Sequence, residues 1–166
     1  MYERCVSGGH LSELDKLIRS VELELAEMNE ELEAVGPLLN LLERRKPDLV
    51  ELRAVATTLH AFYNGVERIF TIIAKHVDGE DLTGRRWHRE LLQRMTLPSE
   101  NRNAVIEMEL ADKLLDYLGF RHRFRHSYPG TLHWNQMAGL VSDLETTHLA
   151  FRTSVSRLLS ALKEAT

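Results

Sequence analysis

The sequence predicts an all-α fold, a bundle of four to five helices that run up and down within one domain spanning residues 1–166. Apolar residues recur at helical spacing along nearly the whole chain, whereas the alternation and the turn dipeptides typical of strands are rare. Short links separate the helical segments, as in a helix bundle. A chain of this length can bury one core without disulfides or metal ions.

The first element is expected to be a long acidic helix at about residues 10–35. Its apolar residues follow alternating steps of three and four, which is typical of a narrow, coiled-coil-like seam. We expect Gly36 and Pro37 to end this helix, because glycine favours C-terminal caps and proline cannot continue a helix interior. The seam consists of Leu11, Leu14, Ile18, Val21, Leu25, Met28, Leu32 and Val35.

A short helical segment at 38–45 leads to a second long helix, which is expected to begin at Pro47 and Asp48. Its apolar face is broader than that of the first helix, so we expect it to lie at the centre of the bundle. The broad face contains Leu52, Val55, Leu59, Phe62, Val66, Ile69 and Ile73, with further apolar residues beside them.

Three more helices follow. A helix of two to three turns is predicted at Trp87–Met95, between a polar loop and a loop that contains Pro98. A third main helix is predicted from about Ala104 to Tyr128, and a fourth from about Asn135 to Lys163.

Composition favours a soluble protein of the cytoplasm. Cys5 is the only cysteine and cannot form an internal disulfide, which favours a reducing compartment. The chain begins without the charged and then apolar segment of a secretion signal. No apolar run approaches the roughly 20 residues of a membrane span.

Charge is unevenly distributed along the chain, which has a net charge of −4. Residues 1–36 hold nine Asp or Glu against three Lys or Arg, whereas residues 85–128 hold nine Lys or Arg against six Asp or Glu. The negative total argues against a long nucleic-acid track, which needs many cationic contacts. A small basic site on an acidic body fits a local phosphate contact.

The basic residues concentrate at the end of the third main helix, in the segment Phe120–Tyr128. Arg121 shares a helix face with the apolar residues Leu114, Tyr117 and Phe124. Because an unpaired arginine on a buried face is costly to desolvate, an anion should meet it. That anion is either a carboxylate from another helix or a phosphate of a substrate.

Arg121 and His126 do not point in the same direction on a straight helix, because five residues turn it by about 140° beyond one full turn. They converge if the helix unwinds before Pro129, or if two subunits share a cleft. Two simpler interpretations remain open. The cations could stabilise the helix C-terminus through its dipole, and His122 with His126 could be metal ligands, although no further ligand lies nearby in sequence.

The spacing Arg121, four residues, His126, one residue, Tyr128 resembles the R-x4-H-x-Y motif of the HepT-like toxins in the HEPN superfamily. Two upstream blocks, 59–70 and 87–92, also resemble a branch of HepT-like proteins, so the likeness covers roughly residues 50–130. Many HepT-like sequences carry asparagine after the motif arginine, where this chain has His122.

The resemblance implies the toxin of a toxin–antitoxin system, a symmetric dimer that cleaves RNA without a metal ion or other cofactor. It implies that His126 is the general acid or base and that Arg121 binds the phosphate, with His122 and Arg125 as secondary candidates for orienting RNA. It also implies that Tyr128 accepts AMP, which an MNT-type nucleotidyltransferase antitoxin transfers from ATP.

A second functional interpretation needs no catalysis. The chain could be a helical dimer that serves as a regulatory module, with its basic helix end holding a nucleotide or the carboxylates of a partner protein. Both interpretations predict a dimer, and they differ in whether His126 is needed for activity.

Overall fold

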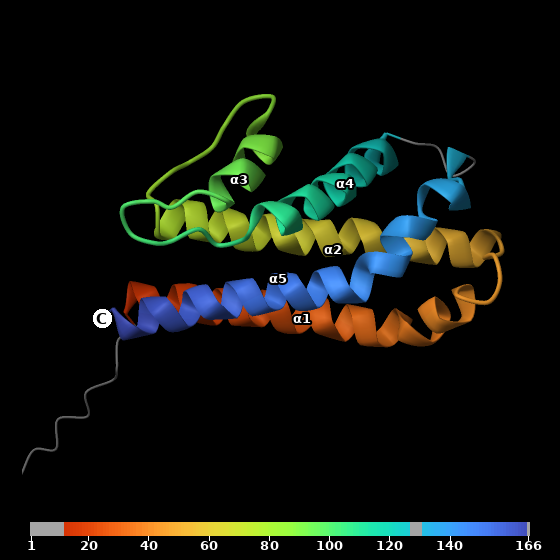
Figure 1. Cartoon of the computed structure of the whole chain (residues 1–166), viewed down its shortest axis with the longest axis horizontal. Helices are drawn as coiled ribbons and strands as arrows, with labels where there is room; N and C mark the ends of the chain where they lie inside the picture. The colour runs from red at the N-terminus through yellow and green to blue at the C-terminus, as the bar shows by residue number, and fades with distance from the viewer. Residues whose placement is uncertain (1–11, 127–130, 166) are drawn as a thin grey trace, which may run out of the picture.

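The computed structural model describes residues 12–126 and 131–165, and the regular elements in these ranges are all helical. The long helices α1, α2, α4 and α5 alternate in direction, and the short helix α3 lies beside α4 on the same side of α2 (Figure 1). The all-α bundle is therefore confirmed, whereas the dimer stays a prediction. The elements are α1 (Glu13–Leu42), α2 (Leu49–His76), α3 (Trp87–Met95), α4 (Met108–Arg125), the 3-10 turn η2 (Trp134–Gln136) and α5 (Ala138–Glu164).

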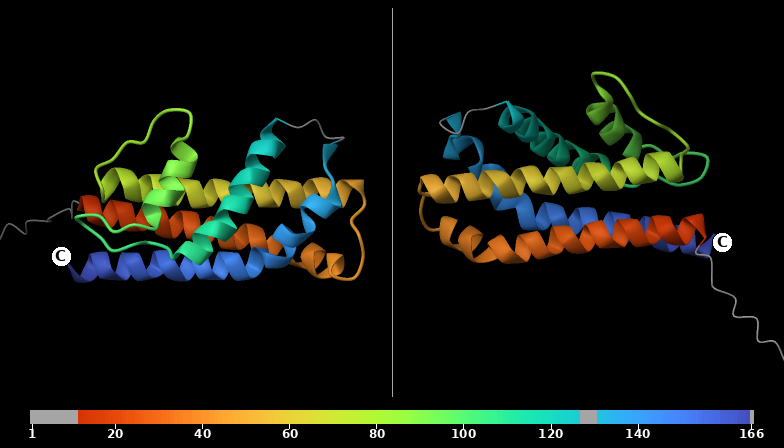
Figure 2. Two further views of the ribbon diagram at one scale, coloured as in Figure 1. Left: turned by 45° about the horizontal axis from the view of Figure 1, so that its top comes forward. Right: turned by 180° about the vertical axis from the view of Figure 1, so that it is seen from behind.

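Helix α2 lies at the centre of the bundle. Helices α1 and α5 lie on one side of it, and α3 and α4 lie on the other (Figures 1 and 2). Half of its 28 residues are buried, as the broad apolar face predicts. It begins at the expected place, because Asp48 and Glu51 cap its N-terminus with reciprocal hydrogen bonds of 2.9 Å between side chain and backbone N–H.

Helix α1 does not end at Gly36 and Pro37 as the sequence analysis expected. It continues through Pro37 to Leu42 and bends near its C-terminal end (Figure 1). A proline inside a helix costs about 3 kcal/mol. The additional turn buries Leu39 and Leu42, each 6% exposed, and burial of a leucine contributes about 1.5–3 kcal/mol. Tertiary burial therefore offsets the local cost of the proline.

Helices α1 and α2 approach each other closely at Gly65. A Cβ atom on Gly65 would lie 2.6 Å from the Met28 sulfur, well inside van der Waals contact. The absence of a side chain on α2 thus makes room for Met28 of α1. This contact holds one face of α2 against α1. The opposite face of α2 is left for α3 and α4.

Helix α4 begins at Met108, not at about Ala104 as predicted. The preceding residues Val105 and Ile106 are 1% exposed, and their N–H groups donate to the carbonyl of Met95 at 2.9 and 3.2 Å. These bonds tie a non-helical segment to the end of α3. The short apolar run is thus a buried connection whose backbone bonds are satisfied without a helix.

A buried ion pair fixes the connection between α3 and α4 to the end of α2. Arg102 Nη2 lies 2.6 Å from Asp78 Oδ2, and the two side chains are 2% and 5% exposed. Ser99 donates to the other carboxylate oxygen of Asp78 at 2.8 Å. These contacts hold α3 and α4 in place over α2. None of the helices in the described ranges is long and apolar enough to cross a membrane.

Candidate functional site

The candidate site lies where α2, α3 and α4 meet. His60, Asn64 and Glu67 occur at spacings of four and three on α2, so they share one face of that helix. This polar stripe interrupts the apolar surface that α2 presents to its neighbours. Arg121 of α4 lies against it.

Arg121 is buried, with 7% of its surface exposed. Its Nε donates to Asn64 Oδ1 at 2.6 Å and its Nη2 donates to Glu67 Oε1 at 3.0 Å. The anion that the sequence analysis required is therefore a carboxylate from another helix. The third nitrogen, Nη1, is buried and has no hydrogen-bond partner among the described residues.

Glu67 also holds His88, the second residue of α3. Its Oε2 lies 2.5 Å from His88 Nδ1. Because an ionised carboxylate can only accept hydrogen bonds, the proton of this contact belongs to His88 Nδ1. One carboxylate thus joins α2, α3 and α4 and fixes the orientation of an imidazole.

The aromatic neighbours of His88 extend the site toward α4. Trp87 lies over the His88 ring with centroids 3.8 Å apart, and the His122 ring meets it edge to face at 5.4 Å. His122 is exposed on one side. Its partial burial, followed by the charges of His88 and Arg121, lowers its pKa. The imidazole of His122 therefore favours the neutral form at neutral pH.

His60 lies on the other side of Arg121 along α2. Its ring packs against Phe124 with centroids 5.1 Å apart, and its buried Nδ1 has no hydrogen-bond partner in the described part of the chain. Burial and the charges of Arg121 and Arg125 lower the pKa of His60. A neutral histidine at this position avoids a third positive charge beside the two arginines.

The remaining predicted residues lie at the exposed end of α4. The helix is intact through Arg125, and His126 is its C-cap, with φ −109° and ψ 2°. Arg125 and His126 are exposed, whereas Arg121 is buried. The helix does not unwind before His126, so the side chains of Arg121 and His126 are not brought together within one subunit. Tyr128 lies outside the described residues.

Sequence reasoning did not assign Asn64 and Glu67 to the site. Both lie within the block that resembles HepT-like proteins. The available signal was their place with His60 at helical spacing on an otherwise apolar helix. That signal shows a polar stripe, but it does not show which helix packs against the stripe. The described residues contain no group of three or more His, Cys, Asp or Glu side chains arranged to hold a metal ion.

Comparison with protein families shows which family this chain belongs to. Residues 54–162 match the family model described as HepT-like protein. This chain belongs to the HepT-like family. The match begins within α2 and ends within α5. It extends past residue 130, where the resemblance seen in the sequence ends, and it leaves out all of α1. Searches of curated proteins and of solved structures gave no significant match.

Membership of the HepT-like family, within the HEPN superfamily, connects the chain with toxin–antitoxin modules and with a superfamily that is generally related to ribonucleases. The matched range contains Asn64, Glu67, His88 and Arg121. The buried cluster of this HepT-like protein therefore lies wholly in the part that defines its family.

Proposed function

We propose that this HepT-like protein is the toxin of a toxin–antitoxin system and acts as a metal-independent endoribonuclease. In this reaction the ribose 2'-oxygen attacks the adjacent phosphorus, the bond from phosphorus to the 5'-oxygen breaks, and a cyclic phosphate forms. The 2'-hydroxyl loses a proton and the departing 5'-oxygen gains one. The protein must therefore provide proton transfer and stabilise an anionic phosphate.

The state of Arg121 is the observation that carries this proposal. Asn64 and Glu67 fix two nitrogens of its guanidinium, whereas the buried Nη1 has no partner among the described residues. A buried polar nitrogen without a partner is costly, and a phosphate oxygen would supply the missing acceptor. Guanidinium groups suit this role because their planar donors match phosphate geometry.

His126 is the proposed general acid or base, and its exposure at the end of α4 leaves it accessible to RNA. Because Arg121 and His126 do not meet within one subunit, we propose that a symmetric dimer brings the arginine of one copy and the histidine of the other to a shared groove. His122 and Arg125, also exposed on the last turns of α4, would orient the RNA.

The proposed regulator is an MNT-type nucleotidyltransferase antitoxin that transfers AMP from ATP to Tyr128. The support for this step is the family membership and the position of Tyr128 two residues beyond His126. An AMP group would add phosphate charge and bulk beside the basic helix end. RNA would then be repelled from the groove that the two subunits of the proposed dimer share.

One observation favours the alternative function, a non-catalytic helical dimer that binds a nucleotide or a protein. Glu67 already neutralises Arg121 at 3.0 Å, so this arginine has a structural role whether or not RNA binds. The two functions differ in the role of His126. A catalytic histidine is needed for toxicity, whereas a histidine that only caps a helix is not.

Expression in bacteria tests the proposal. We expect the wild-type chain to arrest growth and His126→Ala to relieve the arrest, with an unchanged melting temperature and oligomeric mass. His76→Ala is the matched control, because His76 is an exposed histidine in the last turn of α2. This control should remain toxic. Growth arrest by a well-folded His126→Ala variant would reject the catalytic role.

A further inference from the structure

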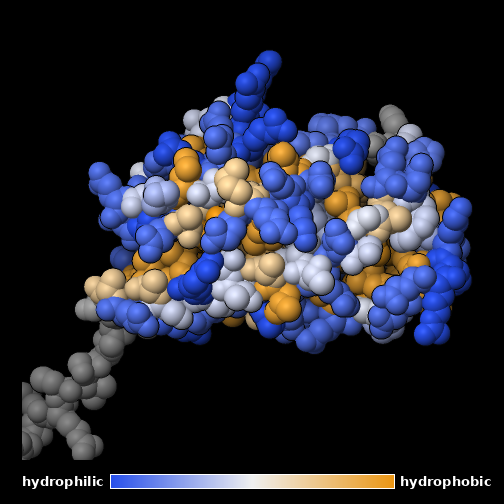
Figure 3. All heavy atoms as spheres, in the orientation of Figure 1, coloured by the Kyte–Doolittle hydropathy of each residue, from blue (hydrophilic) through white to orange (hydrophobic). Residues whose placement is uncertain are grey.

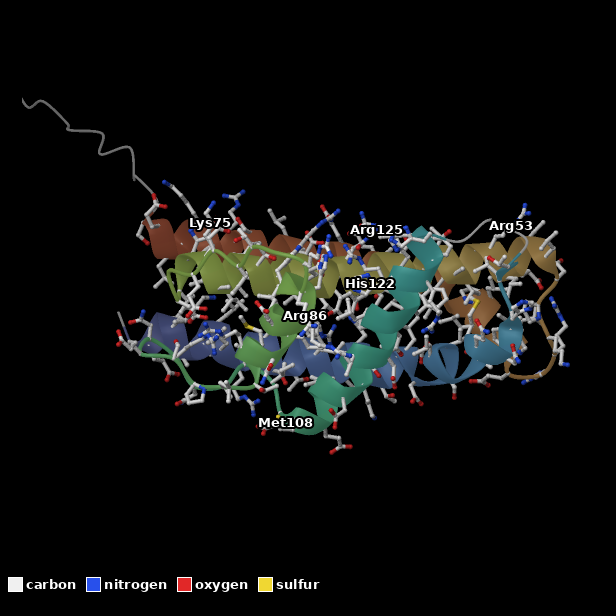
Figure 4. All side chains as sticks on the ribbon, turned by 90° about the horizontal axis from the view of Figure 1, so that it is seen from above. Arg53, Lys75, Arg86, Met108, His122 and Arg125 are labelled. Carbon is white, nitrogen blue, oxygen red and sulfur yellow. The ribbon has the colours of Figure 1, made fainter. Side chains whose placement is uncertain are left out.

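A basic groove runs between α3 and α4. Its walls include Arg85, Arg86 and Arg89 from the start of α3 and His122 from α4, with His88 beside them. Figure 4 places Arg86 and His122 on the two neighbouring helices, and Figure 3 shows strongly hydrophilic side chains protruding where α3 begins. The floor of this groove is formed by Leu115, Leu118 and Gly119 of α4.

No carboxylate lines this basic groove. In contrast, four other hollows on the described part of the molecule each have at least one Asp or Glu in their walls. The distinction is informative because the chain has 25 Asp and Glu against 21 Lys and Arg. Acidic residues are plentiful in the chain, yet none of them lines this groove.

The arginines of the basic groove also differ from the others near α3. Arg94 pairs with Glu80 at 2.8 Å and Arg102 pairs with Asp78 at 2.6 Å. Within the described ranges, Arg85, Arg86 and Arg89 take part in no ion pair. Neighbouring positive charges repel one another unless an anion neutralises them. The arginines of the basic groove are therefore available to bind an anion that contacts several of them at once.

We propose that the basic groove binds the phosphate backbone of single-stranded RNA, next to the cluster of Arg121, Glu67 and His88. This inference rests on the proposed function and specifies where its substrate lies. His88 forms part of the groove wall and shares the Glu67 carboxylate with Arg121. RNA in the groove would thus follow a path that leads to the phosphate-binding residue.

The chemistry of the groove favours RNA over an acidic protein surface. Arginine side chains match phosphate oxygens through their planar donors. The half-buried Trp87 and the rings of His88 and His122 offer aromatic surface beside these cations, and aromatic rings next to a basic groove are typical of single-stranded nucleic-acid binding. A duplex would bury the faces of its bases and leave these rings unused.

Binding of a fluorescent single-stranded RNA, measured by anisotropy at several salt concentrations, tests the groove. The parent carries His126→Ala, so that the RNA is not cut during the titration. We expect Arg86→Ala with Arg89→Ala to weaken binding roughly tenfold at low salt. The slope of log affinity against log salt should fall by about 1.4, because each lost phosphate contact on a single strand contributes about 0.7.

A matched control removes the same charge elsewhere. Arg44→Ala with Arg53→Ala changes two exposed arginines near the opposite end of α2, where Figure 4 shows Arg53 far from Arg86. This double variant should bind RNA like its parent. Equal losses of RNA affinity in the two double variants would overturn the proposal that the groove binds RNA. Such losses would indicate that RNA is attracted only by the total charge of the protein.

Two further outcomes would also overturn the proposal: unchanged RNA binding by the groove variant, or a change in its oligomeric mass, which would assign the groove to contact with another copy. Binding is measured separately from cleavage. If the groove binds RNA as expected and the wild-type chain cuts none, the proposed nuclease fails while the binding site stands.

Discussion

At the scale of single residues, Glu67 connects the parts of the site. One of its oxygens accepts from Arg121 of α4 and the other contacts His88 of α3, and both partners are largely buried. A buried carboxylate that serves two partners cannot be removed without leaving each of them unsatisfied. The geometry of the site and the stability of the fold therefore depend on the same side chain.

A double-mutant cycle tests this dependence. Glu67→Leu leaves Arg121 buried without its carboxylate, so we expect the free energy of unfolding to fall by about 3–5 kcal/mol. Adding Arg121→Met should recover a substantial part of that loss, because a buried pair can be replaced by apolar residues at little cost. Chemical denaturation of the three variants measures both effects.

The surface pair between Arg68 of α2 and Glu24 of α1 is the control for this cycle. Its arginine is 65% exposed and its atoms lie 3.2 Å apart, so Arg68→Met should cost less than about 1 kcal/mol. If Glu67→Leu lowers the free energy of unfolding no more than Arg68→Met does, the buried pair does not hold the helices together. The same conclusion would follow if adding Arg121→Met recovered none of the loss.

The need for an anion beside Arg121 was predictable from the sequence, because an arginine on an apolar helix face must be neutralised. The identity of that anion was not predictable. Glu67 lies 54 residues earlier in the chain, and only the packing of α4 on α2 brings them together. Helical periodicity places a residue on a face of its own helix and carries no information about the facing helix.

At the scale of elements, the sequence correctly predicts the helix boundaries that are set by local features such as a capping residue. Helix α3 has the expected bounds, and α2 starts at its expected cap at Asp48. Two predicted boundaries were wrong for tertiary reasons. Helix α1 passes through Pro37 because Leu39 and Leu42 are buried beyond it, and α4 starts late because Val105 and Ile106 bind the end of α3.

The contact between α1 and α2 gives a prediction at this scale. Gly65→Ala improves helix propensity by about 1 kcal/mol, but its new methyl group would overlap the Met28 side chain, and overpacking costs about 1–3 kcal/mol. We expect the free energy of unfolding to fall by up to about 2 kcal/mol. In a Met28→Ala background the same substitution should be stabilising, because the overlap is gone.

Denaturant titration of the four proteins in this set measures that reversal of sign. Gly139→Ala on α5 is a suitable control, since a Cβ atom there meets nothing within 4 Å. The control should behave alike in both backgrounds. The same destabilisation by Gly65→Ala with and without Met28 would contradict close packing of α1 on α2.

At the scale of the whole molecule, the acidic bundle presents a basic groove where α3 and α4 lie over α2. Helix α1, which lies wholly outside the family match, supports α2 from the opposite side. The fold thus separates a supporting face from a face that carries the candidate site. The separation is consistent with a small local site for RNA on a protein whose total charge is −4.

Incubation of the purified protein with RNA in the presence of a chelator tests the central claim most directly. We expect RNA fragments whose 3' ends carry a cyclic phosphate, produced by the wild type and lost in Arg121→Lys and His126→Ala variants that remain folded. Intact RNA after incubation with the folded wild-type protein, or cleavage that continues in the His126→Ala variant, would contradict the account.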